Sequence, residues 1–203
     1  TETSSTPTAR CILRRGKEES LLRFHPWIFS GAINRMEGTP AEGDLVDVYT
    51  SQGDFIARGH YQIGSITIRV LSFADDQSWW NERIKLAYHM REALGLTNNP
   101  QTTCYRLVHG EGDSLPGLVI DIYGTTAVVQ CHSVGMYRSR KAICTALRNA
   151  YGNRIKSIFD KSGGTLPYNA GLNAQDGYLW GEANASSEPV LENGNRFMVN
   201  WEQ

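Results

Sequence analysis

Residues 42–73, EGDLVDVYTSQGDFIARGHYQIGSITIRVLSF, contain three short β-type runs that turn-forming residues separate. The turns are SQGD at 51–54 and QIGS at 62–65, both rich in the glycine and polar residues that reverse a chain. In the last run, apolar residues alternate with Thr67 and Arg69, which is typical of a strand with one buried and one polar face. The segment therefore predicts consecutive strands at 45–50, 55–61 and 66–73.

The residues before this segment extend the β-rich pattern. A strand is expected at 9–15, a short helix at 17–24 that Pro26 ends, and a further β run at 31–34. Several short strands within one stretch suggest a small barrel or sandwich with one short helix. We therefore expect a first, barrel-like domain over residues 9–74.

The character of the chain changes at Asp75-Asp76. Helices are predicted over 78–96 and 133–151, because apolar residues recur there at helical spacing. The β-type runs between and after them are 105–109, 117–122, 125–131 and 156–160. This order predicts a small α+β middle domain over residues 76–188.

The last part of the chain predicts little regular structure until its end. A loop is expected from Gly163-Gly164 to about Gly181. The pair Asn193-Gly194, flanked by short β-type runs, is a strong hairpin signal. Residues 189–203 are therefore expected to form a final hairpin.

Composition places the chain among ordinary globular proteins. It has 203 residues, 40% hydrophobic and 20% charged, with a formal net charge of −1. Its apolar runs are far too short to span a bilayer, and residues 1–9 lack a secretory signal's apolar region. Disordered, collagen-like and membrane-spanning classes are excluded. A cytoplasmic protein without membrane or metal partners is predicted, and reduced, buried thiols are expected at Cys11, Cys104, Cys131 and Cys144.

Local charge is uneven despite the nearly neutral total. Residues 81–161 hold 11 basic and 6 acidic side chains. In the predicted second helix, Arg138, Lys141 and Arg148 recur on a face that differs from the apolar one. Such a stripe could follow a phosphate backbone or could be a solvated helix face, and both interpretations stay open.

The segment RFHPWIFSGAINR (23–35) combines basic side chains with large aromatic ones. Bases stack on such rings and phosphates meet guanidinium groups, which suits single-stranded or irregular RNA. The alternative is that Trp27 and Phe29 fill the barrel core. The RNA-binding candidates across the chain are Arg14, Arg15, Lys17, Arg23, His25, Trp27, Arg35, Arg58, His60, Tyr61, Arg138, Lys141 and Arg148.

Motifs that would carry catalysis are not evident in the sequence. It has no glycine-rich dinucleotide or phosphate-binding pattern, no zinc-protease motif and no nucleophile-elbow motif. Glu111 and Asp113, in HGEGDSLPG (109–117), either shape the turn, hold a basic side chain of a further domain, or act as a general acid–base pair. No catalytic, cofactor-binding or metal-binding residue is predicted.

Two long motifs carry a resemblance to a known family. HPWIFSGAI (25–33), followed by the β-rich segment 42–73, resembles the PUA-type RNA-binding domain of the class I 23S rRNA cytosine-C5 methyltransferases. YRLVHGEGDSLPGLVIDIYGTTAVVQ (105–130) resembles the middle domain of that family. His109 and Lys161 depart from its pattern.

The resemblance implies a PUA-like β-barrel, an α+β middle domain and then a Rossmann-like domain that binds S-adenosylmethionine and supplies a catalytic cysteine. No residue here matches the motifs of that third domain, so we expect it to be absent and the cofactor to belong to a longer parent protein. The chain is then expected to be a non-catalytic portion that binds 23S rRNA and positions the substrate. The alternatives are a standalone RNA- or protein-binding module and a barrel that serves as a homodimer face.

Overall fold

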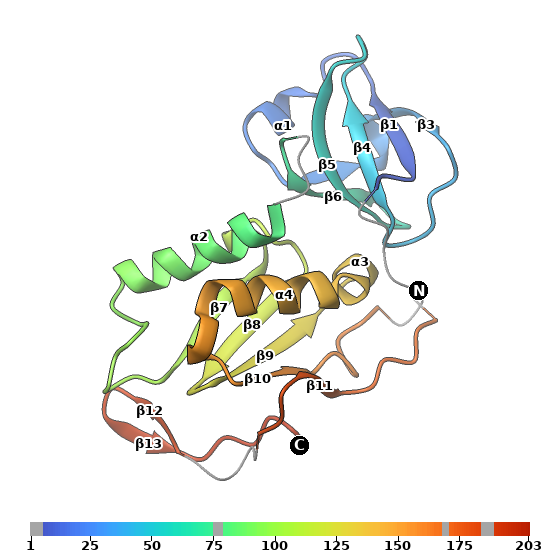
Figure 1. Cartoon of the computed structure of the whole chain (residues 1–203). Helices are drawn as coiled ribbons and strands as arrows, with labels where there is room; N and C mark the ends of the chain where they lie inside the picture. The colour runs from blue at the N-terminus through green and yellow to red at the C-terminus, as the bar shows by residue number, and fades with distance from the viewer. Residues whose placement is uncertain (1–5, 75–78, 168–170, 184–188) are drawn as a thin grey trace. The chain divides into compact units, whose positions relative to one another are not determined.

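A computed structural model of the chain describes residues 6–74, 79–167, 171–183 and 189–203. The chain divides into two compact units (Figure 1). Unit 1 comprises Thr1–Trp79 and Val134–Ser139, and unit 2 comprises Trp80–Ser133 and Arg140–Gln203. The expected domain change at Asp75-Asp76, the helix start at 78 and the boundary at 188 lie outside the described residues.

The units differ from the expected domains in two places. Val134–Ser139, expected in the middle domain, lies in unit 1. Residues 189–203, expected as a separate hairpin, lie in unit 2. Unit 1 is therefore built from two separate stretches of the chain.

Unit 1 is a six-stranded sheet with the strand order β2-β6-β5-β4-β1-β3. β1 and β4 are parallel, and the other neighbours are antiparallel. The strands are β1 (Ala9–Leu13), β2 (Trp27–Phe29), β3 (Ile33–Glu37), β4 (Leu45–Tyr49), β5 (Phe55–Tyr61) and β6 (Ile66–Ser72). The short helices are α1 (Glu19–Leu22), η1 (Ser30–Ala32) and α3 (Val134–Arg138).

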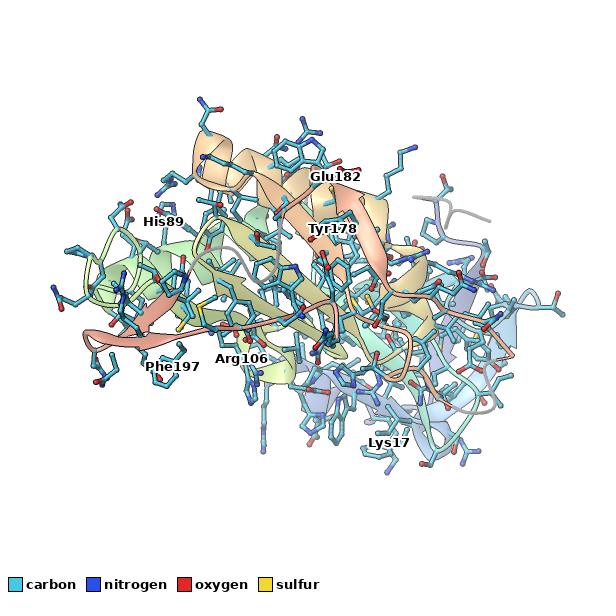
Figure 2. All side chains as sticks on the ribbon, turned by 90° about the horizontal axis from the view of Figure 1, so that it is seen from below. Lys17, His89, Arg106, Tyr178, Glu182 and Phe197 are labelled. Carbon is cyan, nitrogen blue, oxygen red and sulfur yellow. The ribbon has the colours of Figure 1, made fainter. Side chains whose placement is uncertain are left out.

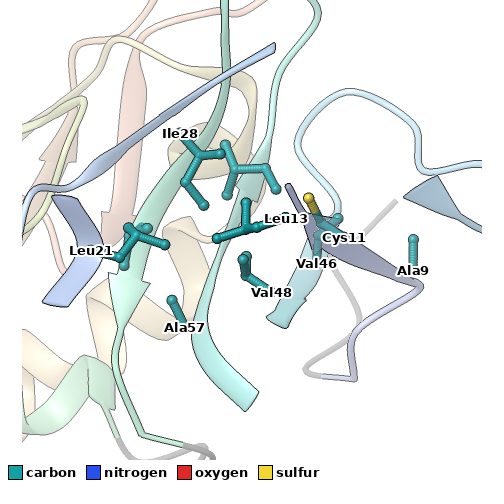
Figure 3. Close-up of a cluster of buried hydrophobic side chains, with 10 residues drawn as sticks. Ala9, Cys11, Leu13, Leu21, Ile28, Val46, Val48 and Ala57 are labelled. Carbon is teal, nitrogen blue, oxygen red and sulfur yellow. The ribbon is translucent and has the colours of Figure 1, made fainter. Parts of the chain in front are cut away.

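One apolar cluster forms the core of unit 1 (Figure 3). It draws Leu13 from β1, Leu21 from α1, Ile28 from β2 and Val48 from β4 to the inner side of the sheet. Leu21 is the buried residue of α1, so this one side chain ties the four-residue helix to the sheet. A helix this short is not stable alone, and packing holds it in place.

Gly59 lies where β5 passes close to β6. A Cβ added to this glycine would lie 2.3 Å from the backbone oxygen of Arg69. We expect Gly59→Ala to lower the free energy of unfolding by about 1–3 kcal/mol, because two paired strands must separate. Gly31→Ala is the matched control, since its added Cβ would have no neighbour within 4 Å. Urea denaturation measures both, and equal stability of the two variants would contradict this packing.

Unit 2 is built around a five-stranded sheet with the order β11-β10-β9-β8-β7. Its strands are β7 (Cys104–His109), β8 (Leu118–Tyr123), β9 (Thr126–Cys131), β10 (Ser157–Asp160) and β11 (Gly177–Trp180). The helices are α2 (Trp79–Ala93) and α4 (Arg140–Tyr151), with short turns η2 (Gly110–Asp113) and η3 (Gly152–Arg154). A small separate ladder pairs β12 (Val190–Glu192) with β13 (Asn195–Phe197).

The second domain, predicted as a small α+β domain, also contains one parallel pair of strands. β9 and β10 are parallel neighbours, and α4 lies between them in the chain. This is a β-α-β crossover, the unit from which doubly wound folds are built. The other pairings in this sheet are antiparallel, so the sheet is mixed.

Both faces of the unit 2 sheet are covered. α2 and α4 lie side by side over one face (Figure 1), where the rings of Tyr88 and Tyr151 meet at 4.9 Å. A smaller cluster of Val128, Phe159 and Trp201 packs apart from this. The Nζ of Lys161 donates to the backbone oxygens of Trp201 at 2.8 Å and Gln203 at 2.6 Å. This lysine therefore fastens the C-terminal residues to the sheet.

Two sequence expectations in this region are wrong. The helix expected over 133–151 is interrupted at Ser139, whose hydroxyl donates to the backbone oxygen of Gly135 at 2.8 Å. β11 lies inside the expected loop. The sequence does not predict this strand, because its residues are all half-buried and show no alternation of apolar and polar side chains.

Within the part of the chain that the structure describes, no helix is both long and apolar enough to cross a membrane. The same residues contain no group of three His, Cys, Asp or Glu side chains suited to a metal ion.

Candidate nucleic-acid interface

A hollow of about 690 Å³ lies on unit 1 beside α1. The chain leaves β1, turns at Gly16 with φ +77°, forms α1 and then enters β2. Phe24 ends this helix with φ 60°, a left-handed conformation that is uncommon for a large side chain. Its backbone N–H donates to the Leu21 oxygen at 2.8 Å, which closes the turn. The lining residues are Gly16, Lys17, Glu19, Ser20, Arg23, Phe24, His25 and Pro26.

Aromatic rings line this region of unit 1. Phe24 is 73% exposed, and the edge contact of its ring with Phe73 (5.1 Å between centroids) supports it from one side. The rings of His25 and Trp27 meet edge-to-face at 5.9 Å, and those of Trp27 and Phe29 at 6.4 Å. His25, Trp27 and Phe29 alternate with Pro26 and buried Ile28. The segment therefore turns one face to the core and presents the three rings on the other face.

Positive charge accompanies these rings. Arg14, Arg15, Lys17 and Arg23 are all exposed, and Lys17 lies at the margin of the blue first unit (Figure 2). Among the residues that line the hollow, only Glu19 is acidic. The backbone N–H of Trp27 donates to Nδ1 of His25 at 3.3 Å, which fixes the ring and leaves Nε2 as the other hydrogen-bonding atom. The arrangement suits a ligand with phosphates and flat bases.

The structure corrects two RNA-binding candidates. Arg58 and His60 are each only 4% exposed, so neither forms part of a surface. The Arg58 guanidinium pairs with Asp47 through Nε–Oδ1 at 2.7 Å and Nη2–Oδ2 at 3.1 Å. His60 packs against Gly135, where an added Cβ would lie 2.3 Å from its ring, and burial lowers the pKa of His60 to about 3. Ala57 and Gly59, which point to the opposite face, are buried as well, so β5 is covered on both faces. Its sequence does not reveal this.

The other candidates do not form one surface. Tyr61 packs against the unit 1 core, and Arg35 pairs with Glu37 at 2.9 Å. Arg138 lies in unit 1, whereas Lys141 and Arg148 lie in unit 2. The expected stripe of these three residues is therefore divided by the break at Ser139.

One basic residue of this face is missing from the candidates. The guanidinium carbon of Arg69 lies 5.8 Å from the centre of the Trp27 ring, and Nε of Arg69 donates to Gln62 at 3.0 Å. The alternation in β6 points Arg69 away from the core, but only the pairing of β2 with β6 brings it opposite Trp27.

Asp113 has a structural role in unit 2. It accepts hydrogen bonds from Arg91 through both carboxylate oxygens (Nη2–Oδ2 2.8 Å) and from the backbone N–H of His109 at 2.6 Å. Its side chain is 3% exposed. Of the interpretations left open for this loop, Asp113 follows the turn-shaping one, and its basic partner is Arg91 of this chain rather than a side chain of a further domain.

The four cysteines are free thiols, as expected, but two of them are only partly buried. Burial raises the pKa of both Cys11 and Cys131 to about 12. The pKa values of Cys104 and Cys144 are also raised, mainly by burial. Since the thiolate is the nucleophile, none of these thiols is prepared for nucleophilic attack.

Comparison with known proteins first gives a class of domain. Residues 11–73 match the family model of the PUA-like domain, which covers most of the sheet of unit 1. Relatives then give a more particular likeness over nearly the whole chain. The chain is 38% identical over 197 residues to the Ribosomal RNA large subunit methyltransferase I of Erwinia tasmaniensis. This alignment covers 95% of the chain and 49% of that protein. The protein of the same name from Yersinia pseudotuberculosis is 36% identical over 201 residues, covering 97% and 50%.

Solved structures share the fold. A candidate SAM-dependent methyltransferase from Streptococcus mutans superposes with a TM-score of 0.72 at 19% identity, covering 94% of this chain and 48% of that one. A candidate methyltransferase complexed with SAH superposes with a TM-score of 0.71 at 19% identity. The chain spans about half the length of the curated relatives it matches.

These comparisons overturn two expectations. The expected fold class, an α+β chain from which a Rossmann-like methyltransferase domain is absent, is contradicted, because 94% of the chain shares its fold with 48% of the Streptococcus mutans chain. The interpretation as a non-catalytic portion or a standalone binding module is also contradicted, because 95% of the chain aligns with 49% of the Erwinia tasmaniensis Ribosomal RNA large subunit methyltransferase I.

Proposed function

We propose that this protein is an S-adenosylmethionine-dependent methyltransferase of large-subunit ribosomal RNA. The observation that carries the proposal is the 38% identity that extends over 95% of the chain to Ribosomal RNA large subunit methyltransferase I. The finer proposal is methylation at C5 of a cytosine in 23S rRNA, and it rests on the motifs at 25–33 and 105–130. The cytoplasmic location expected from the sequence is part of this proposal.

We assign RNA contact to the basic and aromatic face of unit 1. Lys17 and Arg23 supply charges for phosphates, and exposed Phe24 supplies a ring for a base. Stacking of one base on an aromatic side chain contributes about 1–3 kcal/mol. The match of residues 11–73 to the PUA-like domain supports this choice of unit.

Neither the hollow of unit 1 nor the cavity beside η3 fits S-adenosylmethionine. Its sulfonium is a cation, which an arginine-lined or basic site without carboxylates disfavours. The cavity beside η3 is lined by no carboxylate and contains the Arg154 cation, and the hollow of unit 1 is basic. Methyl transfer is therefore not assigned to the residues that line these two hollows.

The test of the activity uses the whole protein in its own cells. Disruption of the gene should remove one 5-methylcytosine from 23S rRNA, measured by mass spectrometry of nuclease fragments, and the restored gene should return it. An rRNA with unchanged methylation would overturn the proposed activity.

The RNA-contact face is tested separately on this chain with a 23S rRNA transcript. We expect Lys17→Ala with Arg23→Ala to reduce the slope of log affinity against log salt by about 1–2, because each lost phosphate contact removes about 0.7–0.9. Phe24→Ala should weaken binding by about tenfold with an unchanged salt slope. Lys85→Ala, at an exposed lysine of α2, is the matched control. An unchanged affinity in both folded variants would contradict the assignment.

A further inference from the structure

A second cavity, of about 450 Å³, lies within unit 2. Its walls come from the segment after α2, from β7 and β8, and from the end of α4 with η3. The volume is within the range of small-molecule sites in proteins. The lining residues that the argument uses are Thr97, Tyr105, Tyr151 and Arg154.

Thr97 is the feature that points to a ligand. It is 9% exposed, and its Oγ1 is buried without a hydrogen-bond partner. A buried hydroxyl without a partner costs about 1–3 kcal/mol, so such atoms are rare unless something outside the chain satisfies them. By contrast, the neighbouring hydroxyls of Thr102 and Thr103 accept from the backbone N–H groups of Asn193 at 3.1 Å and Leu191 at 2.9 Å.

The part of the cavity lined by Tyr105, Tyr151 and Arg154 is aromatic and carries one cation. The guanidinium carbon of Arg154 lies 4.7 Å from the centre of the Tyr88 ring and 5.6 Å from that of Tyr151. Arg154 also donates to the hydroxyl of Tyr88 and to the backbone oxygen of Tyr151 at 3.2 Å. The hydroxyls of Tyr105 and Tyr151 share a hydrogen bond of 2.8 Å. Nη2 of Arg154 also donates to the backbone oxygen of Ala150 at 3.3 Å, so all three guanidinium nitrogens are held. Arg154 is exposed, and the two remaining N–H groups of its guanidinium are those that could meet an anion.

This set of groups selects for a ligand chemistry. No carboxylate lines the cavity, and Arg154 is its only charged lining residue, so a cationic ligand is disfavoured. Aromatic and apolar walls suit a flat ring, the hydroxyl of Thr97 suits the polar edge of that ring, and a guanidinium suits a phosphate.

We propose that this cavity binds one nucleotide, with its base beside Thr97 and its phosphate at Arg154. The proposal rests on the proposed function in that an RNA enzyme handles nucleotides. The nucleotide could come from the RNA chain or from the free pool, and the chemistry of the site is the same for both.

The experiment titrates cytidine 5′-monophosphate and cytidine into the full chain and follows amide signals by NMR. Thr97→Val keeps the shape of the side chain and should weaken binding of both ligands about fivefold, since one hydrogen bond is lost. It should also raise the Tm of the free protein, because the unsatisfied hydroxyl is gone. Thr145→Val is the matched control, because that hydroxyl is exposed and bonds to the Lys141 backbone oxygen at 3.0 Å.

The phosphate position has its own variant. Arg154→Gln should weaken binding of the monophosphate about tenfold and leave cytidine almost unchanged. Arg148→Gln is the matched control, because Arg148 is an exposed arginine whose guanidinium lies 4.6 Å from the centre of the Trp180 ring. Thermal melts confirm that each variant is folded.

A third arm identifies the source of the nucleotide. Displacement of a short RNA by cytidine 5′-monophosphate would assign the cavity to a nucleotide of the RNA chain, and binding without competition would assign it to a free nucleotide. Signal changes outside the cavity, or an affinity that Thr97→Val leaves unchanged, would overturn the proposal. Thr97-dependent binding together with unchanged rRNA methylation in the gene disruption would instead overturn only the proposed function.

Discussion

Replacement of Asp47 by alanine is expected to lower the free energy of unfolding of unit 1 by about 3–5 kcal/mol. The side chains of Asp47 and Arg58 are 13% and 4% exposed, and they are joined by two hydrogen bonds. Removal of the carboxylate leaves a buried guanidinium without its charged partner. Urea denaturation followed by circular dichroism measures the loss.

Two further variants separate the buried charge from other effects. Glu37→Gln removes the acid of an exposed ion pair in the same sheet (38% exposed) and should cost no more than about 1 kcal/mol. The double variant Asp47→Leu with Arg58→Met should recover much of the stability, because it leaves no buried charge. A double variant as unstable as Asp47→Ala would contradict this explanation.

Acid is expected to destabilise unit 1 through His60. Burial lowers the pKa of His60 from 6.5 to about 3 in the folded chain. Between these values the unfolded chain binds a proton that the folded chain does not, so stability is complete above pH 6.5 and falls as the pH decreases toward 3. At about 1.4 kcal/mol per pH unit, a decrease from pH 7 to pH 5 should cost about 2 kcal/mol. Denaturation curves at the two pH values measure this.

The control variants are compared by how much their stability changes between pH 7 and pH 5, not by their stability at one pH. His60→Gln should remove most of the difference between pH 7 and pH 5, whatever its stability at pH 7. His109→Gln, at an exposed histidine, should keep the difference. The same pH dependence in His60→Gln and in the parent chain would show that other groups cause it.

Local sequence patterns predict those parts of the fold that depend on neighbours along the chain. Alternation finds β4, β5 and β6, and the Asn193-Gly194 pair finds the hairpin of β12 and β13. β2 is missed because it has only three residues and follows Pro26. The break at Ser139 is missed because the apolar spacing continues through it, while the two halves belong to different units.

The candidate site shows the same division. Lys17, Arg23 and His25 are neighbours in sequence, and the structure brings them to one hollow. Arg58 and His60 look like a polar strand end, but packing between distant segments buries them. The cavity of unit 2 gave no sequence signal, because its walls come from three separate segments of the chain, within residues 96–105, 122–125 and 151–154.

The discontinuity of unit 1 bears on the order of events during synthesis. Val134–Ser139 belongs to this unit, yet it is translated about 60 residues after Trp79. At about 5–20 residues per second, a ribosome needs about 3–12 s for that interval. During this time the six-stranded sheet can pair, but His60 lacks the neighbour that Gly135 provides. The nascent chain therefore completes its first unit only after β7, β8 and β9 of the second unit have been translated. The first unit cannot finish folding before synthesis of the second has begun.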